Sequence, residues 1–113
     1  MPIVEHSSLP SFARLREQGQ EVLSLNDALT QDIRELHIGL LNMMPDAAFD
    51  VTERQFMRLL GSSNQIVQLF VHPFTVEGLP RSTETQAYID EHYTTFEHLC
   101  EEGLDAIIIT GAN

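Results

Sequence analysis

Three apolar runs, each about as long as a β-strand, constrain the fold of this chain more than any other feature. They lie at residues 36–43, 65–72 and 105–111, and the first and third are almost continuously hydrophobic. Such a run is typical of a strand buried on both faces, as in a parallel sheet, because a half-exposed strand would alternate apolar and polar residues. Helix-length segments separate the runs, so the predicted element order is β-α-β-α-β.

Strands joined by helical crossovers lie parallel, and the crossovers are right-handed. The sequence therefore predicts an α/β fold with a flavodoxin-like parallel sheet, in which the three strands lie in the order 2-1-3.

Polar residues and glycines indicate where the two intervening helices begin and end. Thr52 and Gln55 form a capping-box pattern, which predicts that the first helix begins at Thr52 and ends near Gly61. A similar pattern at Thr83 predicts a second, long helix that continues to Gly103.

The 113 residues are enough for one small domain. Residues 1–35 fit neither the helical nor the strand period well, and we interpret them as an N-terminal arm with a short helix around residues 11–18. Residues 36–113 form the N-terminal part of an α/β domain.

The third predicted strand points to missing neighbours. Its Ile107-Ile108-Ile109 segment has β-branched residues on both faces, and the sequence ends soon afterwards, at Asn113. An apolar edge strand left open invites aggregation. We therefore expect that more polypeptide follows this strand, or that another subunit covers it, and we favour the first.

Composition excludes several classes of function. The net charge of −11 would repel nucleic acids and anionic membranes. No run of about 20 apolar residues and no signal peptide is present, so we expect a cytoplasmic protein. The single cysteine, Cys100, excludes an internal disulfide, and the absence of lysine excludes Schiff-base chemistry from this chain.

In open α/β sheets, ligands bind beyond the carboxyl ends of the strands, at the point where the strand order reverses. Two loops are expected to wall such a crevice here, and their residues are Asn42, Met43, Met44, Pro45, Thr110, Gly111, Ala112 and Asn113. Backbone N–H groups near Gly111 could hold an oxyanion there. The alternative is an ordinary turn that ends a strand.

Other candidate sites are weaker. Asp46 and Asp50 suggest the acidic pocket of a phosphoacceptor domain, but solvated loop acids are commoner and the lysine of such a pocket is absent. His92 and His98 do not share a helical face, so we expect surface histidines and no metal site. Acidic neighbours and a late helical position disfavour a thiolate at Cys100, which we interpret as a small packing residue.

Four motifs, in order, resemble the homoserine O-succinyltransferase (homoserine O-acetyltransferase) family. They are Leu-Asn-Met-Met-Pro at residues 41–45, Thr-Glu-Arg-Gln-Phe-Met-Arg-Leu-Leu at 52–60, His-Tyr-Thr-Thr-Phe-Glu at 92–97 and Leu-Asp-Ala-Ile-Ile-Ile-Thr-Gly-Ala at 104–112. The family usually carries a lysine shortly after the Met-Pro pair, whereas this chain has Asp46 there. It also tends to have proline where this chain has Asn113.

The resemblance implies a class I glutamine-amidotransferase-like fold and a ping-pong reaction. An acyl group passes from succinyl- or acetyl-coenzyme A to a cysteine, and then to the hydroxyl of homoserine or a related amino acid, in methionine biosynthesis. The family's catalytic cysteine, histidine and glutamate lie further along the sequence, so no catalytic residue is expected in this chain and Cys100 is not the nucleophile. The resemblance implies acyl-coenzyme A as a co-substrate and no bound cofactor. It also implies that the enzyme is a homodimer.

On this interpretation Glu53 and Gln55 hold the first helix in place beside the crevice. The alternative function is a non-catalytic binding or assembly module of flavodoxin-like fold, which completes its sheet through a partner. A third hypothesis, a glutamine amidotransferase relative that transfers ammonia, is disfavoured by the four motifs.

Overall fold

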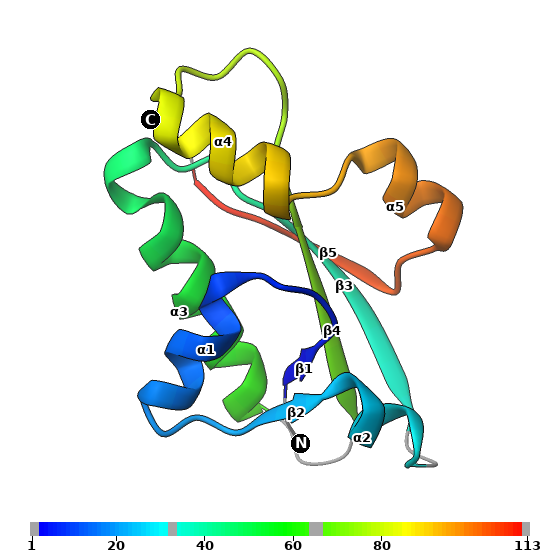
Figure 1. The fold of residues 1–113 in the computed structure, drawn as a ribbon. Coiled ribbons are helices and arrows are strands. Elements are labelled where there is room, and N and C mark those ends of the chain that lie inside the picture. The colour runs from blue at the N-terminus through cyan, green and yellow to red at the C-terminus, as the bar shows by residue number, and fades with distance from the viewer. Residues whose placement is uncertain (1–2, 32–33, 64–66, 112–113) are drawn as a thin grey trace.

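The computed structural model of the chain describes residues 3–31, 34–63 and 67–111. In these ranges it has an α/β fold with a single parallel sheet (Figure 1). The strands are β1 (Ile3–Glu5), β2 (Val22–Ser24), β3 (Glu35–Leu41), β4 (Gln68–Phe74) and β5 (Ala106–Ile109). The helices are α1 (Pro10–Glu17), α2 (Leu25–Leu29), a 3-10 turn at Asp46–Ala48, α3 (Phe49–Ser63), α4 (Thr83–His92) and α5 (Phe96–Glu102).

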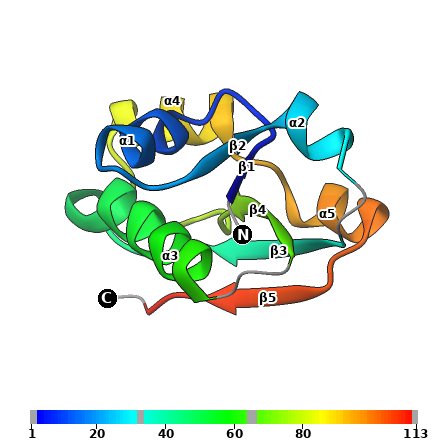
Figure 2. The same ribbon diagram turned by 90° about the horizontal axis from the view of Figure 1, so that it is seen from below.

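The sheet order is β2-β1-β4-β3-β5, and all neighbouring strands are parallel (Figure 2). The three strands predicted from the apolar runs are β3, β4 and β5, and their order β4-β3-β5 confirms the predicted order 2-1-3. The sheet as a whole does not have the flavodoxin order, because β1 and β2 extend it beyond β4.

The N-terminal segment is more regular than its sequence indicates. The short helix is confirmed as α1, but the segment also contributes β1 and β2 to the sheet. These strands are three residues long, too short for a period to be visible in the sequence. The division of the chain into residues 1–35 and 36–113 stays a prediction.

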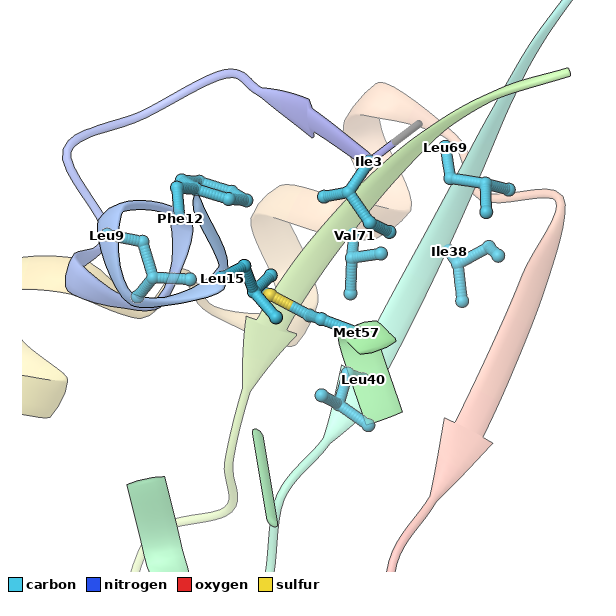
Figure 3. Close-up of a cluster of buried hydrophobic side chains, with 9 residues drawn as sticks. All are labelled: Ile3, Leu9, Phe12, Leu15, Ile38, Leu40, Met57, Leu69 and Val71. Carbon is cyan, nitrogen blue, oxygen red and sulfur yellow. The ribbon is translucent and has the colours of Figure 1, made fainter. Parts of the chain in front are cut away.

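The main core lies between the sheet and the helices α1 and α3. It contains nine buried side chains, drawn in Figure 3: Ile3, Leu9, Phe12, Leu15, Ile38, Leu40, Met57, Leu69 and Val71. Successive side chains of a strand point to opposite faces of a sheet. Ile38 and Leu40 therefore face this core, while His37 and Gly39 face the other side of the sheet.

Gly39 lies at a close approach in the middle of the sheet, paired with His72 on one side and Ile107 on the other. A Cβ atom at this position would lie 3.0 Å from Leu104 Cδ1 and 3.2 Å from Phe74 Cε1. A side chain larger than hydrogen would therefore displace its neighbours, which explains a glycine inside a strand.

The capping-box prediction at Thr52 is wrong. A 3-10 turn leads directly into α3, which begins at Phe49 and continues past Gly61 to Ser63, so Thr52 lies inside the helix. The side chain of Gln55 is exposed on α3. At the next helix the capping residue is Ser82, whose hydroxyl accepts a hydrogen bond from the Thr85 N–H at 3.1 Å.

The predicted long helix after Thr83 is two helices. Thr94 adopts an extended conformation, bridges Phe74 in parallel and donates its N–H to Pro73 O at 3.2 Å. The Thr95 hydroxyl then caps α5 by accepting from the His98 N–H at 3.2 Å. Gly103 ends α5 with a φ of 91°, as predicted.

The outer strand β5 leaves apolar surface uncovered. Ile107 is 46% exposed and Ile109 is 63% exposed, while Ile108 packs against the core. The expectation that further polypeptide or another subunit covers this strand stays a prediction.

Candidate functional site

The two predicted loops lie side by side at the carboxyl ends of β3 and β5. The Thr110 N–H donates to Leu41 O at 3.0 Å, and the Met43 N–H donates to the Thr110 hydroxyl at 2.9 Å. The topology-based prediction that these loops adjoin is therefore confirmed. Ala112 and Asn113 lie outside the described residues.

Asn42 is fully buried and organises the first loop from within. Its amide nitrogen donates to Phe49 O at 3.0 Å and to the Tyr93 hydroxyl at 3.1 Å, while its side-chain oxygen accepts from the Met44 N–H at 3.2 Å. The Asn42 carbonyl accepts from the Thr75 hydroxyl at 2.7 Å. The side chain of Asn42 thus holds the loop and does not project from its surface.

Met43, Met44 and Pro45 are half-buried, and Gly111 is exposed. A Cβ atom added to Gly111 would meet no atom within 4 Å, so open space borders the backbone here. The role of Gly111 in ligand binding stays a prediction.

Glu53 is a fully buried carboxyl group bonded to three hydroxyl groups. It accepts hydrogen bonds from Tyr93 at 2.6 Å, from Tyr88 at 2.9 Å and from Ser11. Burial raises the pKa of Glu53, and the three hydrogen bonds partly oppose this shift. Burial, and then the charge of Glu53, also raise the pKa values of Tyr88 and Tyr93.

This network joins four parts of the chain. Ser11 belongs to α1, Glu53 to α3 and Tyr88 to α4, while Tyr93 also binds Asn42 in the crevice loop. The sequence indicates Glu53 as a support but carries no sign of its partners. Only the fold brings Ser11, Tyr88 and Tyr93 to it.

A cavity of about 430 Å³ opens beside this network, between the first turns of α1, α3 and α4. Arg14, Arg54, Asp50 and Glu84 are among the residues that line it, and Arg54 is paired with Asp50 at 3.3 Å. Among the predicted crevice residues that the structure describes, none lines this cavity. We therefore take the joined loops as the candidate site, because they lie where open α/β sheets bind ligands.

The five histidines of the chain line a second cavity of about 500 Å³. The side chain of His92 is only 11% exposed, so the expectation of a surface histidine holds for His98, at 57%, and not for His92. His37 Nδ1 lies 2.9 Å from His72 Nε2, with the two ring planes at 11°. Such an N–H···N hydrogen bond needs one protonated and one unprotonated nitrogen.

Burial and the neighbouring histidines His6, His37 and His98 lower the pKa of His72 from 6.5 to about 4. Between these values the unfolded chain binds a proton that the folded chain does not bind, so the free energy of unfolding falls as the pH decreases from 6.5 to 4. The full shift corresponds to about 3 kcal/mol, and partial exposure reduces the expected loss to about 1–2 kcal/mol.

Urea unfolding at several pH values, followed by circular dichroism, checks this prediction. His72→Gln should flatten the dependence on pH. His98→Gln removes only the smallest of the three histidine contributions to the lowered pKa of His72, so it should leave most of the dependence in place. Comparing variants at each pH removes the contribution of carboxyl groups such as Glu53. Parallel pH curves for wild type and His72→Gln would contradict the prediction.

In the parts of the chain that the structure describes, no three His, Cys, Asp or Glu side chains are arranged to hold a metal ion. None of the helices in these parts is long and apolar enough to cross a membrane. Cys100 is exposed on α5, so its interpretation as a packing residue is wrong.

Comparison with known proteins shows which family the chain belongs to. The sequence profile of the family described as homoserine O-succinyltransferase matches residues 2–113. The homoserine O-succinyltransferases of Methylobacter tundripaludum, Allochromatium vinosum and Methylococcus capsulatus are 63%, 62% and 59% identical to the chain. Each alignment covers 100% of this chain and 32% of the relative. The chain thus spans about a third of its curated relatives, and it belongs to the homoserine O-succinyltransferase family.

Proposed function

We propose that this chain is the N-terminal part of an enzyme that transfers a succinyl or acetyl group from coenzyme A to the hydroxyl of homoserine or a related amino acid. The observation that carries the proposal is the family match along essentially the whole chain. The joined loops after β3 and β5 support it, because they lie where α/β enzymes bind substrates.

The proposed reaction proceeds in two steps. A cysteine thiolate attacks the thioester carbonyl of acyl-coenzyme A and expels the coenzyme A thiolate, which takes up a proton. The homoserine hydroxyl then attacks the acyl-cysteine and gives its proton to a base, while the cysteine thiolate leaves. Dividing one difficult transfer into two easier ones is the advantage of a covalent intermediate. We expect the cysteine and its histidine and glutamate partners in sequence that follows this segment.

The contribution of this chain is a wall of the active site. The N–H groups of Met43 and Met44 already bond to Thr110 and Asn42, so they are not available to an oxyanion. Gly111 borders open space. Because glycine lets a ligand come close to the backbone, we propose that the Gly111 N–H is the group in this wall that faces developing negative charge.

The exposed isoleucines of β5 support the view that further polypeptide completes the sheet. Ile107 and Ile109 present apolar surface on the outermost strand. We propose that the following segment covers them in a glutamine-amidotransferase-like fold, and that the complete enzyme is a cytoplasmic homodimer.

The same surface favours the second candidate, an assembly module that pairs β5 with a partner subunit. The two candidates differ in the sequence that follows Asn113. A reading frame that continues into a cysteine-bearing strand and a His-x-Glu pair supports the acyltransferase, whereas a stop codon there supports the module.

Intact mass spectrometry tests the proposed chemistry. After incubation with succinyl- or acetyl-coenzyme A, the protein from the full reading frame should gain one acyl group, whose mass identifies the donor. A protein limited to residues 1–113 should gain none, and Cys100→Ser should not change the adduct of the longer protein. An acyl group on Cys100 would overturn the assignment of the nucleophile.

A further inference from the structure

Arg81 lies immediately before α4, with its side chain only 4% exposed. By comparison, the ion-paired side chain of Arg16 is 42% exposed. Removing a guanidinium group from water is costly unless hydrogen bonds and charges replace the lost hydration. The contacts of the Arg81 side chain must therefore replace the water that burial removes.

The partners of Arg81 all belong to, or contact, the crevice loop after β3. Its Nη1 donates to the Met44 carbonyl, and its Nη2 donates to the Thr75 hydroxyl at 3.4 Å. The guanidinium carbon lies 4.5 Å from the ring centroid of Phe49, in a cation–π contact. Thr75 in turn donates to the Asn42 carbonyl, so Arg81 acts on both ends of the loop.

Asp46, the residue after the crevice loop, lies beside Arg81 and Ser82. Its Oδ2 accepts from the Ser82 N–H at 2.7 Å, and its Oδ1 lies 3.9 Å from Arg81 Nη1. The Ser82 backbone hydrogen bond, with a smaller contribution from the charge of Arg81, lowers the pKa of Asp46. The Asp46 carboxylate is therefore ionised. The consecutive residues Arg81 and Ser82 bind the loop through this charge and through hydrogen bonds.

The backbone N–H groups at the start of the loop bond to residues at or just beyond the ends of the flanking strands. Asn42 N–H donates to Phe74 O at 2.9 Å, and Met43 N–H donates to Thr110. The Met44 carbonyl differs, because it accepts from Arg81 in the connection before α4. Arg81 and its neighbour Ser82 thus tie the far end of the loop to the connection before α4.

We propose that Arg81 is a positioning residue for acyl transfer, which acts through the Met44 carbonyl and Asp46 to hold residues 42–46 against Thr110. This inference rests on the proposed function. Arginine suits the role better than lysine because its planar group donates in two directions and stacks on Phe49 at the same time. Lysine keeps the positive charge, but it lacks the two divergent N–H donors and the planar group that packs on a ring.

The test uses the protein from the full reading frame and measures kcat and KM with succinyl- or acetyl-coenzyme A and homoserine. Small displacements of a positioned group can cost on the order of 100-fold in rate. We expect Arg81→Gln to lower kcat about 100-fold and Arg81→Lys about 10-fold, with KM for both substrates within about twofold of wild type. Arg58→Gln is the matched control, because Arg58 is exposed on α3 and its hydrogen bond within the described residues goes to Gln18, far from the loop.

Added guanidinium ion separates positioning from folding. It should partly restore kcat in Arg81→Ala, and it should not raise the rate of wild type or of Arg58→Gln. A kcat within twofold of wild type in Arg81→Lys and Arg81→Gln would overturn the inference, and so would a loss that matches the unfolded fraction measured by circular dichroism. If Arg81→Gln does not fold, the kcat of Arg81→Lys and the rescue of Arg81→Ala by guanidinium ion test the inference instead. A wild-type protein without acyl transfer would instead reject the proposed function.

Discussion

Replacing Glu53 with alanine is expected to lower the free energy of unfolding by about 3–5 kcal/mol. The carboxyl group accepts from Ser11, Tyr88 and Tyr93, and the residue is fully buried. Alanine would leave hydroxyl groups in the interior without their acceptor, at about 1–3 kcal/mol for each unsatisfied group, and would add a cavity. Partial entry of water keeps the total below the simple sum.

Two variants make this prediction specific. Glu53→Gln keeps the shape and one acceptor oxygen, so the expected loss is about 1–2 kcal/mol. Gln55→Ala removes an exposed side chain from the same helix and should change stability by less than about 0.5 kcal/mol. Urea unfolding followed by circular dichroism measures all three. Equal losses for Glu53→Ala and Gln55→Ala would show that the buried network contributes nothing.

Phe12→Ala is the second change with a large expected effect, a loss of about 3–5 kcal/mol in the free energy of unfolding. Phe12 of α1 is 0% exposed and belongs to the core cluster of Figure 3. Alanine removes the aromatic ring and leaves a cavity that the surrounding side chains only partly fill. The prediction tests whether the N-terminal segment is an integral part of the fold.

Phe96→Ala is the matched control for Phe12→Ala. Phe96 is 48% exposed on α5, and its ring stacks on that of Phe74 at 5.8 Å between centroids. Its truncation should cost about 1 kcal/mol, since less apolar surface returns to water. Thermal unfolding of both variants provides the comparison. A Phe12→Ala protein as stable as Phe96→Ala would mean that α1 is a detachable arm.

The sequence predicts the strands β3, β4 and β5 but not the strands β1 and β2. The strands β3, β4 and β5 are visible because strands buried on both faces are rich in apolar residues, and the flavodoxin-like arrangement then predicts their order. The strands β1 and β2 are only three residues long, and β1 joins the central sheet through the pair Ile3–Leu69, which no local pattern indicates. The break between α4 and α5 depends on a bridge from Thr94 to Phe74, which no local pattern reveals.

The candidate site divides in the same way. Adjacency of the loops at Met43 and Thr110 follows from topology and is predictable. The roles of Arg81 and Tyr93 are not, because Arg81 meets Met44 across 37 residues of sequence and Tyr93 meets Asn42 across 51. Contacts at such separations leave no trace in a local motif.

The place of β1 in the sheet sets the order in which the chain can assemble during synthesis. Ile3 pairs with Leu69 of β4, so β1 leaves the ribosome well before this partner and cannot join the central strands until β4 has emerged. Until then the apolar residues of the N-terminal segment stay open to solvent and to chaperones, and closing so long a loop costs entropy before any pairing repays it. A strand that is made early is therefore among the last to reach its final place in the sheet.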